Sequence, residues 1–83
     1  MTTLMYPIST EKAIGMIERS NIIEYIVDSR ATKTEIKKEF EALFKVKVQR
    51  IATAMTPRNM KKAYIKIDPK FKASDIALKL KLV

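Results

Sequence analysis

The sequence lacks histidine, cysteine and tryptophan, and it has one glycine among 83 residues. Without histidine and cysteine there is no imidazole base, no disulfide scaffold and no thiolate metal site. One glycine excludes a glycine-rich phosphate loop. No apolar run is long enough to span a membrane, and the first residues do not read as a signal peptide. We therefore expect a soluble intracellular protein with no membrane insertion.

The acidic residues also form no recognisable catalytic group. Glu39 and Glu41 are two positions apart on a predicted helix, so their carboxylates do not face each other. Asp28, Asp68 and Asp75 fall at the ends of predicted elements, where carboxylates cap helices and close turns. We predict no catalytic residue, no metal ligand, no cofactor and no small-molecule substrate, and hence no enzyme.

Positive charge is abundant and unevenly placed. Lysine and arginine number 17 against 9 acidic residues, a net charge of +8. Residues 1–44 have a net charge of −1, whereas residues 45–83 have a net charge of +9. A surplus concentrated in one half predicts a surface for an anionic partner. Solvated lysines that serve only solubility are the alternative explanation.

The length fits one domain, residues 1–83, and no linker or repeat divides it. The apolar pattern predicts an extended segment at 3–6, a helix capped by Ser9 or Thr10 that runs to residue 19, and a strand at 22–28. Apolar residues on both parities of that strand indicate that both of its faces are covered.

The next helix has the strongest local pattern. Thr32 and Glu35 have the spacing of a capping box. Apolar residues then recur as one stripe formed by Ile36, Phe40, Leu43 and Phe44. We expect the charged residues between them to face water: Lys37, Lys38, Glu39 and Glu41.

The second half predicts a hairpin followed by a weaker element. Residues 46–55 and 61–67 read as strands joined by a turn at 56–59, and the second strand alternates cleanly between apolar and polar residues. Residues 73–82 read as a helix, although alternating leucines leave a strand possible. The order β-α-β-α-β-β-α predicts an α/β (α+β) sandwich with an antiparallel or mixed sheet of three to four strands covered by helices.

The hairpin carries the best candidate site. A basic ribbon with one aromatic residue can contact phosphates and stack on a sugar or base. Its members are Lys47, Arg50, Arg58, Asn59, Lys61, Lys62, Tyr64 and Lys66. Lys62 and Lys66 point away from the apolar face, so we expect the fold to tolerate their replacement. Tyr64 can also be a cover residue, and the lysines can also protect an exposed sheet edge.

A second candidate anion site is the start of the helix at residue 33. Lys33 opposes the helix dipole there, and a phosphate bound beside Lys33 and Thr34 would reverse that unfavourable interaction. A surface lysine near a helix cap is the simpler alternative.

Four stretches in series resemble the family of large-subunit ribosomal protein twenty-three. They are Pro-Ile-Ser-Thr-Glu-Lys-Ala at 7–13, Ala-Thr-Lys-Thr-Glu-Ile-Lys at 31–37, Leu-Phe-Lys-Val-Lys-Val at 43–48 and Lys-Lys-Ala-Tyr-Ile at 61–65. The resemblance implies an α/β/α sandwich on a four-stranded antiparallel sheet. It also implies a cytoplasmic ribosomal protein that binds the third domain of large-subunit rRNA at the polypeptide exit tunnel, beside neighbouring ribosomal proteins.

The resemblance further implies roles for single residues. Lys12, Lys33, Lys61, Lys62 and Tyr64 would lie against rRNA. Glu11 would belong to a docking surface for the signal recognition particle or other nascent-chain factors, and Glu18, two helical turns on, would extend it.

Two departures from the family pattern are visible. Residues 51–53 are Ile-Ala-Thr where members often have Val-Asn-Thr, which leaves Thr53 as the RNA contact there. The short turn at 56–59 resembles the archaeal type and has no tunnel-lining extension. The alternatives are a free-standing small RNA- or DNA-binding protein, or a protein-docking adaptor with a basic face.

Overall fold

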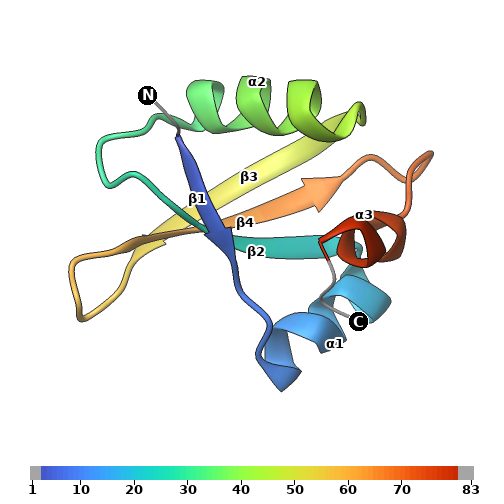
Figure 1. Ribbon diagram of the computed structural model, residues 1–83, viewed down its shortest axis with the longest axis horizontal. Helices are drawn as coiled ribbons and strands as arrows, with labels where there is room; N and C mark the ends of the chain where they lie inside the picture. The colour runs from blue at the N-terminus through green and yellow to red at the C-terminus, as the bar shows by residue number, and fades with distance from the viewer. Residues whose placement is uncertain (1–2, 81–83) are drawn as a thin grey trace.

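A computed structural model describes residues 3–80, which form a four-stranded sheet and three helices. Figure 1 shows how these elements are arranged. The strand order is β1-β2-β4-β3 and every neighbouring pair is antiparallel, which confirms the predicted fold class and element order. The elements are β1 (Leu4–Pro7), α1 (Glu11–Ser20), β2 (Ile22–Val27), α2 (Lys33–Phe44), β3 (Val48–Met55), β4 (Lys61–Ile67) and α3 (Ala73–Lys79). Within residues 3–80, no helix is long and apolar enough to cross a membrane.

The last element is a helix, so the strand alternative for residues 73–82 is wrong. The helix α3 ends at Lys79, and the part of the prediction that covers residues 81 and 82 lies outside the described residues. Its buried residues are Ala73, Ile76 and Ala77, which lie at i, i+3 and i+4 and form one apolar face. This buried face stabilises the helix, whereas the alternating leucines would have favoured a strand.

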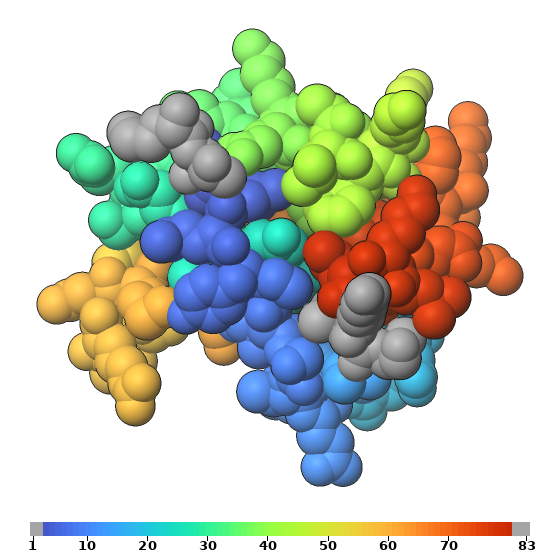
Figure 2. Space-filling model, viewed as in Figure 1, coloured from blue at the N-terminus to red at the C-terminus, as the bar shows by residue number. Residues whose placement is uncertain are grey.

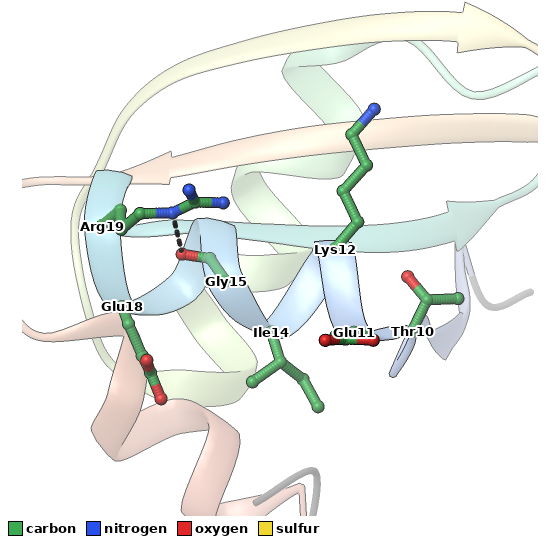
Figure 3. A pocket seen from close by; sticks show the side chains of 7 residues that line it. All are labelled: Thr10, Glu11, Lys12, Ile14, Gly15, Glu18 and Arg19. Carbon is green, nitrogen blue, oxygen red and sulfur yellow. Dashed lines mark hydrogen bonds between the residues drawn. The ribbon is translucent and has the colours of Figure 1, made fainter.

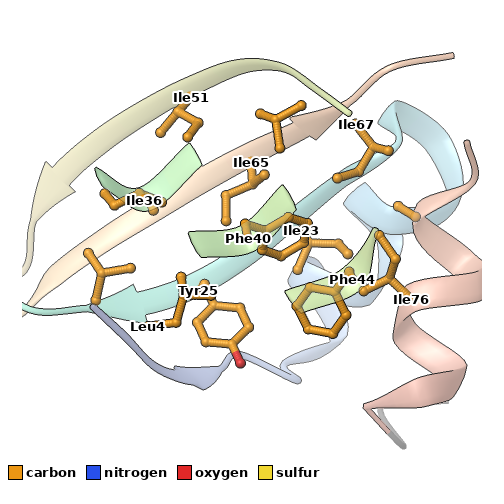
Figure 4. Close-up of a cluster of buried hydrophobic side chains, with 14 of the residues drawn as sticks. Leu4, Ile23, Tyr25, Ile36, Phe40, Phe44, Ile51, Ile65, Ile67 and Ile76 are labelled. Carbon is orange, nitrogen blue, oxygen red and sulfur yellow. The ribbon is translucent and has the colours of Figure 1, made fainter. Parts of the chain in front are cut away.

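The sheet lies between α2 on one side and α1 on the other, as Figures 1 and 3 both show. The main core fills the space between the sheet and α2, with α3 closing one end (Figure 4). Phe40 sits at its centre, with its ring centroid 4.6 Å from that of Phe44 and 6.3 Å from that of Tyr25. β2 is buried on both faces, as predicted: Ile23 belongs to the core, and Glu24 and Ile26 are buried on the other face.

The helix ends follow the residues that cap them. The Thr10 hydroxyl accepts a hydrogen bond from the Ala13 amide, so Thr10 rather than Ser9 is the cap of α1. The predicted capping box of α2 is confirmed: Thr32 Oγ1 accepts from the Glu35 amide at 3.2 Å, and Glu35 Oε1 accepts from the Thr32 amide at 2.9 Å.

Asn21 connects the end of α1 to the segment between β4 and α3. It terminates α1 in the left-handed conformation at φ 57°, where asparagine is better tolerated than most residues. Its side-chain amide donates to the carbonyls of Ile67 and Phe71, and its side-chain oxygen accepts from the Ala73 amide at 2.7 Å. These three bonds fix the start of α3 beside the end of α1.

The stripe predicted for α2 is correct at three of its four positions. Ile36, Phe40 and Phe44 are buried, whereas Leu43 is 60% exposed. The buried residues are spaced by four, and Leu43 lies about 100° around the helix from Phe44, on a flank that faces solvent. Lys37 and Lys38 are exposed as predicted.

Glu39 and Glu41 do not simply face water, and that prediction was wrong. The Glu39 carboxylate accepts hydrogen bonds from the amides of Thr3 and Leu4, and the Glu41 carboxylate accepts one from the Val48 amide at 2.8 Å. Backbone amides at the ends of the edge strands need partners, and the two glutamates supply them from the helix above. Both therefore hold α2 onto the sheet.

Candidate nucleic-acid interface

The strand register separates two faces of the β3–β4 hairpin. Ala63, Ile65 and Ile67 point into the core, and the polar residues between them point the other way, as predicted. We call this second surface the hairpin face, formed by Arg50, Lys62, Tyr64 and Lys66. Ala52 and Ala54 lie beside Tyr64 and Lys62 in the register. Because their side chains are short, the surface of the hairpin face is lower over β3 at these positions than over Tyr64 and Lys62 of β4.

Lys62 marks one end of the hairpin face, and its charge is already paired. Its Nζ lies 3.4 Å from Oε1 of Glu24, whose side chain is 5% exposed. The same Nζ lies 5.7 Å from the ring centroid of Tyr64, within cation–π range. A buried carboxylate needs a partner, so Lys62 neutralises Glu24 before any ligand arrives. Glu24 was missed in the sequence, although a lone charge inside an apolar strand is the pattern that could have revealed it.

Lys66 marks the opposite end, beside a second cation. Arg50 is its direct neighbour across the strands, and Gln49 completes a shallow hollow with the two of them. In the described part of the chain, the ion pairs involve Arg30 and Lys62 rather than Arg50 or Lys66. Two like charges placed opposite each other on a sheet repel, and an anion bound between them would remove that repulsion.

Lys61 and Thr53 lie on the other side of the hairpin. Thr53 pairs with Ala63 and Lys61 pairs with Met55, so both have the parity of the core face. The Lys61 ammonium donates to the Ala31 carbonyl at 2.7 Å, and so supports the loop before α2. The structure therefore does not bring these two predicted residues together with Lys62 and Lys66. The alternation of the strand already gave Lys61 this parity, but its partner in a distant loop is invisible in the sequence.

The remaining hairpin residues lie at its ends. Arg58 and Asn59 are exposed at the turn, and Asn59 adopts the left-handed conformation at φ 61°, which asparagine tolerates. Lys47 precedes β3 rather than belonging to it, and its carbonyl accepts a hydrogen bond from the Asp68 amide. Since Lys47 precedes β3 and Arg58 lies in the turn between β3 and β4, the two residues stand at opposite ends of the hairpin.

The start of α2 holds Lys33 and Thr34, both exposed. The Glu35 carboxylate occupies part of this helix end through the capping box. Hydrogen bonds from Thr32, chiefly from its backbone amide, favour the charged form of Glu35 and lower its pKa below its ordinary value. A negative charge already satisfies the helix end, which weakens the case for a phosphate at Lys33 and Thr34.

The helix α1 presents two different sides (Figure 3). Lys12 extends towards β2 and β4, whereas Glu18 and Ile14 point the opposite way. Glu11, Lys12 and Glu18 are all exposed. Arg19 folds back along the helix, and its Nε donates to the Gly15 carbonyl at 3.3 Å. Lys12 is therefore directed towards the strand β4 of the hairpin face, and Glu18 points away from it.

Comparison with known families decides what kind of protein carries this basic hairpin. Residues 2–80 match the family model described as ribosomal protein L23. The chain belongs to the ribosomal protein L23 family. This confirms the resemblance drawn from the four sequence stretches, and the match extends over nearly all of the chain.

A named relative in the ribosomal protein L23 family is the large ribosomal subunit protein uL23 of Trypanosoma brucei brucei. This chain is 45% identical to it over 80 residues, which are 96% of this chain and 49% of the relative. The chain thus spans about half the length of the curated relative that it matches.

Proposed function

We propose that this chain is a structural constituent of the large ribosomal subunit in the cytoplasm and binds large-subunit rRNA without catalysing a reaction. Membership of the ribosomal protein L23 family supports the assignment of this chain to the large ribosomal subunit. The net charge of +9 in residues 45–83 supports RNA as its binding partner. On this proposal residues 1–83 act as one rRNA-binding domain with the third domain of the rRNA as its target.

The observation that carries the RNA-binding proposal is the Arg50–Lys66 pair. These cations face each other across two strands without a carboxylate partner among residues 3–80. A phosphate between them gains two favourable contacts and removes their repulsion. Tyr64, half-buried beside the paired Lys62, offers a ring face for a ribose or a base.

The outlying residues extend this interface. Lys12 extends from α1 towards β2 and β4, and Arg58 adds a cation at the hairpin turn. Lys47 and Asn59 flank the hairpin, and Lys33 and Thr34 stand apart from it at the start of α2. We expect Lys61 and Thr53 to contribute to the fold rather than to RNA contact, because of the face on which they lie.

The other side of α1 suits a protein partner. Glu11 and Glu18 line one shallow surface of α1 with Ile14 and Gly15, and Lys12 and Arg19 border the same surface. Within it, Glu18 and Ile14 point away from Lys12. The proposal places this surface at the exit-tunnel rim, where it would meet the signal recognition particle or other nascent-chain factors. Neighbouring ribosomal proteins are the remaining partners.

The salt dependence of RNA binding tests this function. Each phosphate contact should lower the logarithm of affinity by about 0.7–0.9 per unit of log salt. With roughly four contacts, from Arg50, Lys66, Lys12 and Arg58, the slope against a transcript of the third rRNA domain should be about −3. A slope shallower than about −1 would contradict the proposal.

Co-sedimentation separates the ribosomal function from its alternatives. We expect the protein to remain with large subunits in sucrose gradients after a moderate salt wash. Release from subunits with retained affinity for free RNA would indicate a free-standing RNA-binding protein. Binding to an acidic protein but not to rRNA would indicate a docking adaptor.

A further inference from the structure

A second basic hollow lies on the core side of the sheet, between the end of α2 and α3. We call it the α2–α3 hollow and define it by Lys45, Lys70, Lys72 and Lys79. All four lysines are exposed, and partly buried Phe71 and Val46 contribute apolar surface beside them. Among the described residues that line it, Asp75 is the one carboxylate. In Figure 2 the end of α2 and the segment of α3 lie next to each other at the right of the molecule.

Lys45 occupies a conformation that lysine rarely adopts. Its φ is 55° and its ψ is 45°, the left-handed region that glycine and asparagine fill most readily. The two other residues with positive φ in the described part of the chain are asparagines, Asn21 and Asn59. A lysine at the end of α2 also interacts favourably with the helix dipole. The dipole of α3 accounts in the same way for Lys79, which lies in the last turn of that helix. Lys70 and Lys72 precede α3, and neither helix dipole accounts for them.

We propose that the α2–α3 hollow binds the phosphates of a second RNA segment, distinct from the segment at the hairpin face. The inference rests on the proposed function for the class of its ligand. Four cations around one concave surface suit a phosphodiester backbone, and Phe71 gives a sugar or base an apolar contact.

Two segments are required because the sheet stands between the two surfaces. Lys62, Tyr64 and Lys66 point away from the core, whereas the hollow is lined by Phe44 and Ile76, which are part of the core. One straight backbone cannot touch both sides. A protein that holds two segments of one folded RNA gains affinity through effective concentration, and it also fixes the distance between them.

Lysine footprinting of the full chain tests this inference. The probe is a transcript of the third rRNA domain, and the readout is acylation of each lysine by mass spectrometry. We expect severalfold protection of Lys45, Lys70 and Lys72 together with Lys66, while Lys37 and Lys38 on the outer surface of α2 stay reactive.

Each other outcome has a definite meaning. Protection of Lys66 alone overturns the proposal that the α2–α3 hollow binds a second RNA segment, and it leaves the proposed function intact. No protection at either surface overturns both. Equal protection of Lys37 and Lys38 shows nonspecific coating and overturns the inference. Protection of the hollow by an acidic peptide such as polyglutamate, but not by the transcript, assigns it to a protein partner and also overturns the inference.

Replacement of Lys45 separates binding from folding. Lys45→Asn removes the charge and introduces a residue that tolerates positive φ. We expect an unchanged or higher thermal midpoint and a severalfold loss of RNA affinity for Lys45→Asn combined with Lys72→Gln. The control, Lys37→Gln with Lys38→Gln, removes the same charge from the outer surface of α2 and should keep most of the affinity. Equal losses in the two variants would show that only net charge matters and would overturn the proposal.

Discussion

The two ends of the hairpin face carry lysines that look alike in the sequence and differ in the structure. Lys62 lies 3.4 Å from a buried carboxylate and against an aromatic ring, so its charge serves the fold. Lys66 lies opposite Arg50, and neither of these two cations forms an ion pair with a carboxylate among residues 3–80. The difference comes from the neighbouring strand: β2 contributes Glu24 near Lys62 and an isoleucine, Ile22, opposite Lys66.

This comparison shows that a count of lysines overstates the charge that is free to bind. A cation that is already paired with a buried anion neutralises little of the charge of an RNA phosphate, because the pair is close to neutral. Its contact with the phosphate therefore releases few counterions from the RNA. An unpaired cation beside another cation gains a favourable contact with the phosphate, and the bound phosphate also removes the repulsion between the two cations. We therefore assign RNA affinity to the Arg50–Lys66 end and stability to the Lys62–Glu24 end.

The largest expected effect tests whether the two faces are separate. Ile65→Asp places a charge at a fully buried position in the core and should destabilise the protein by more than about 4 kcal/mol, enough to unfold it. Lys66→Asp changes the adjacent residue on the hairpin face and should leave the fold intact. Circular dichroism and thermal melts distinguish the two, and equal stability of both variants would show that the assigned faces are wrong.

A smaller effect on stability distinguishes the two lysines. Lys62→Gln leaves Glu24 buried without its cation and should destabilise by about 1–3 kcal/mol, whereas Lys66→Gln should cost almost nothing. The sequence predicted that both could be replaced without harm to the fold, and the ion pair changes this expectation for Lys62.

A double-mutant cycle isolates the ion pair. Adding Glu24→Gln to Lys62→Gln should recover part of the lost stability, measured by urea denaturation of the four proteins. Additive losses would mean that the two side chains do not interact and that Lys62 acts through some other contact.

The smallest effect has the opposite sign. Arg50→Gln relieves like-charge repulsion with Lys66 and should raise the free energy of unfolding by about 0.2–1 kcal/mol at low salt. The gain should disappear at high salt, where the repulsion is screened. Melts at two ionic strengths measure it, and a loss of stability at low salt would show that Arg50 has a stabilising partner.

Local patterns predicted most of the fold because they are set by near neighbours in the chain. The capping box at Thr32 and the alternation from Lys61 to Ile67 depend on residues within a few positions, and both are confirmed. Glu39 and Glu41 were misjudged because their hydrogen-bond partners are amides outside the helix. Leu43 was misplaced because the width of a buried stripe depends on what packs against it.

The sequence predicted which residues form the candidate site, but it did not predict which of their charges are already paired within the protein. The sequence identifies Lys62, Tyr64 and Lys66 as one face, since parity along a strand determines it. It does not tell which strand lies beside β4, and that neighbour decides whether a lysine is paired. The same holds for Lys61, whose ammonium reaches the Ala31 carbonyl across 30 positions of sequence.

The most direct test compares salt slopes for binding to a transcript of the third rRNA domain. Lys66→Gln should make the slope shallower by about 0.7–0.9, the amount expected for one lost phosphate contact. The double variant Glu24→Gln with Lys62→Gln should leave the slope unchanged, and so should Lys37→Gln, which matches the charge change of Lys66→Gln on the outer surface of α2. If the Glu24–Lys62 variant changes the slope as much as Lys66→Gln does, or if Lys66→Gln leaves it unchanged, the assignment of binding charge to the Arg50–Lys66 end is wrong.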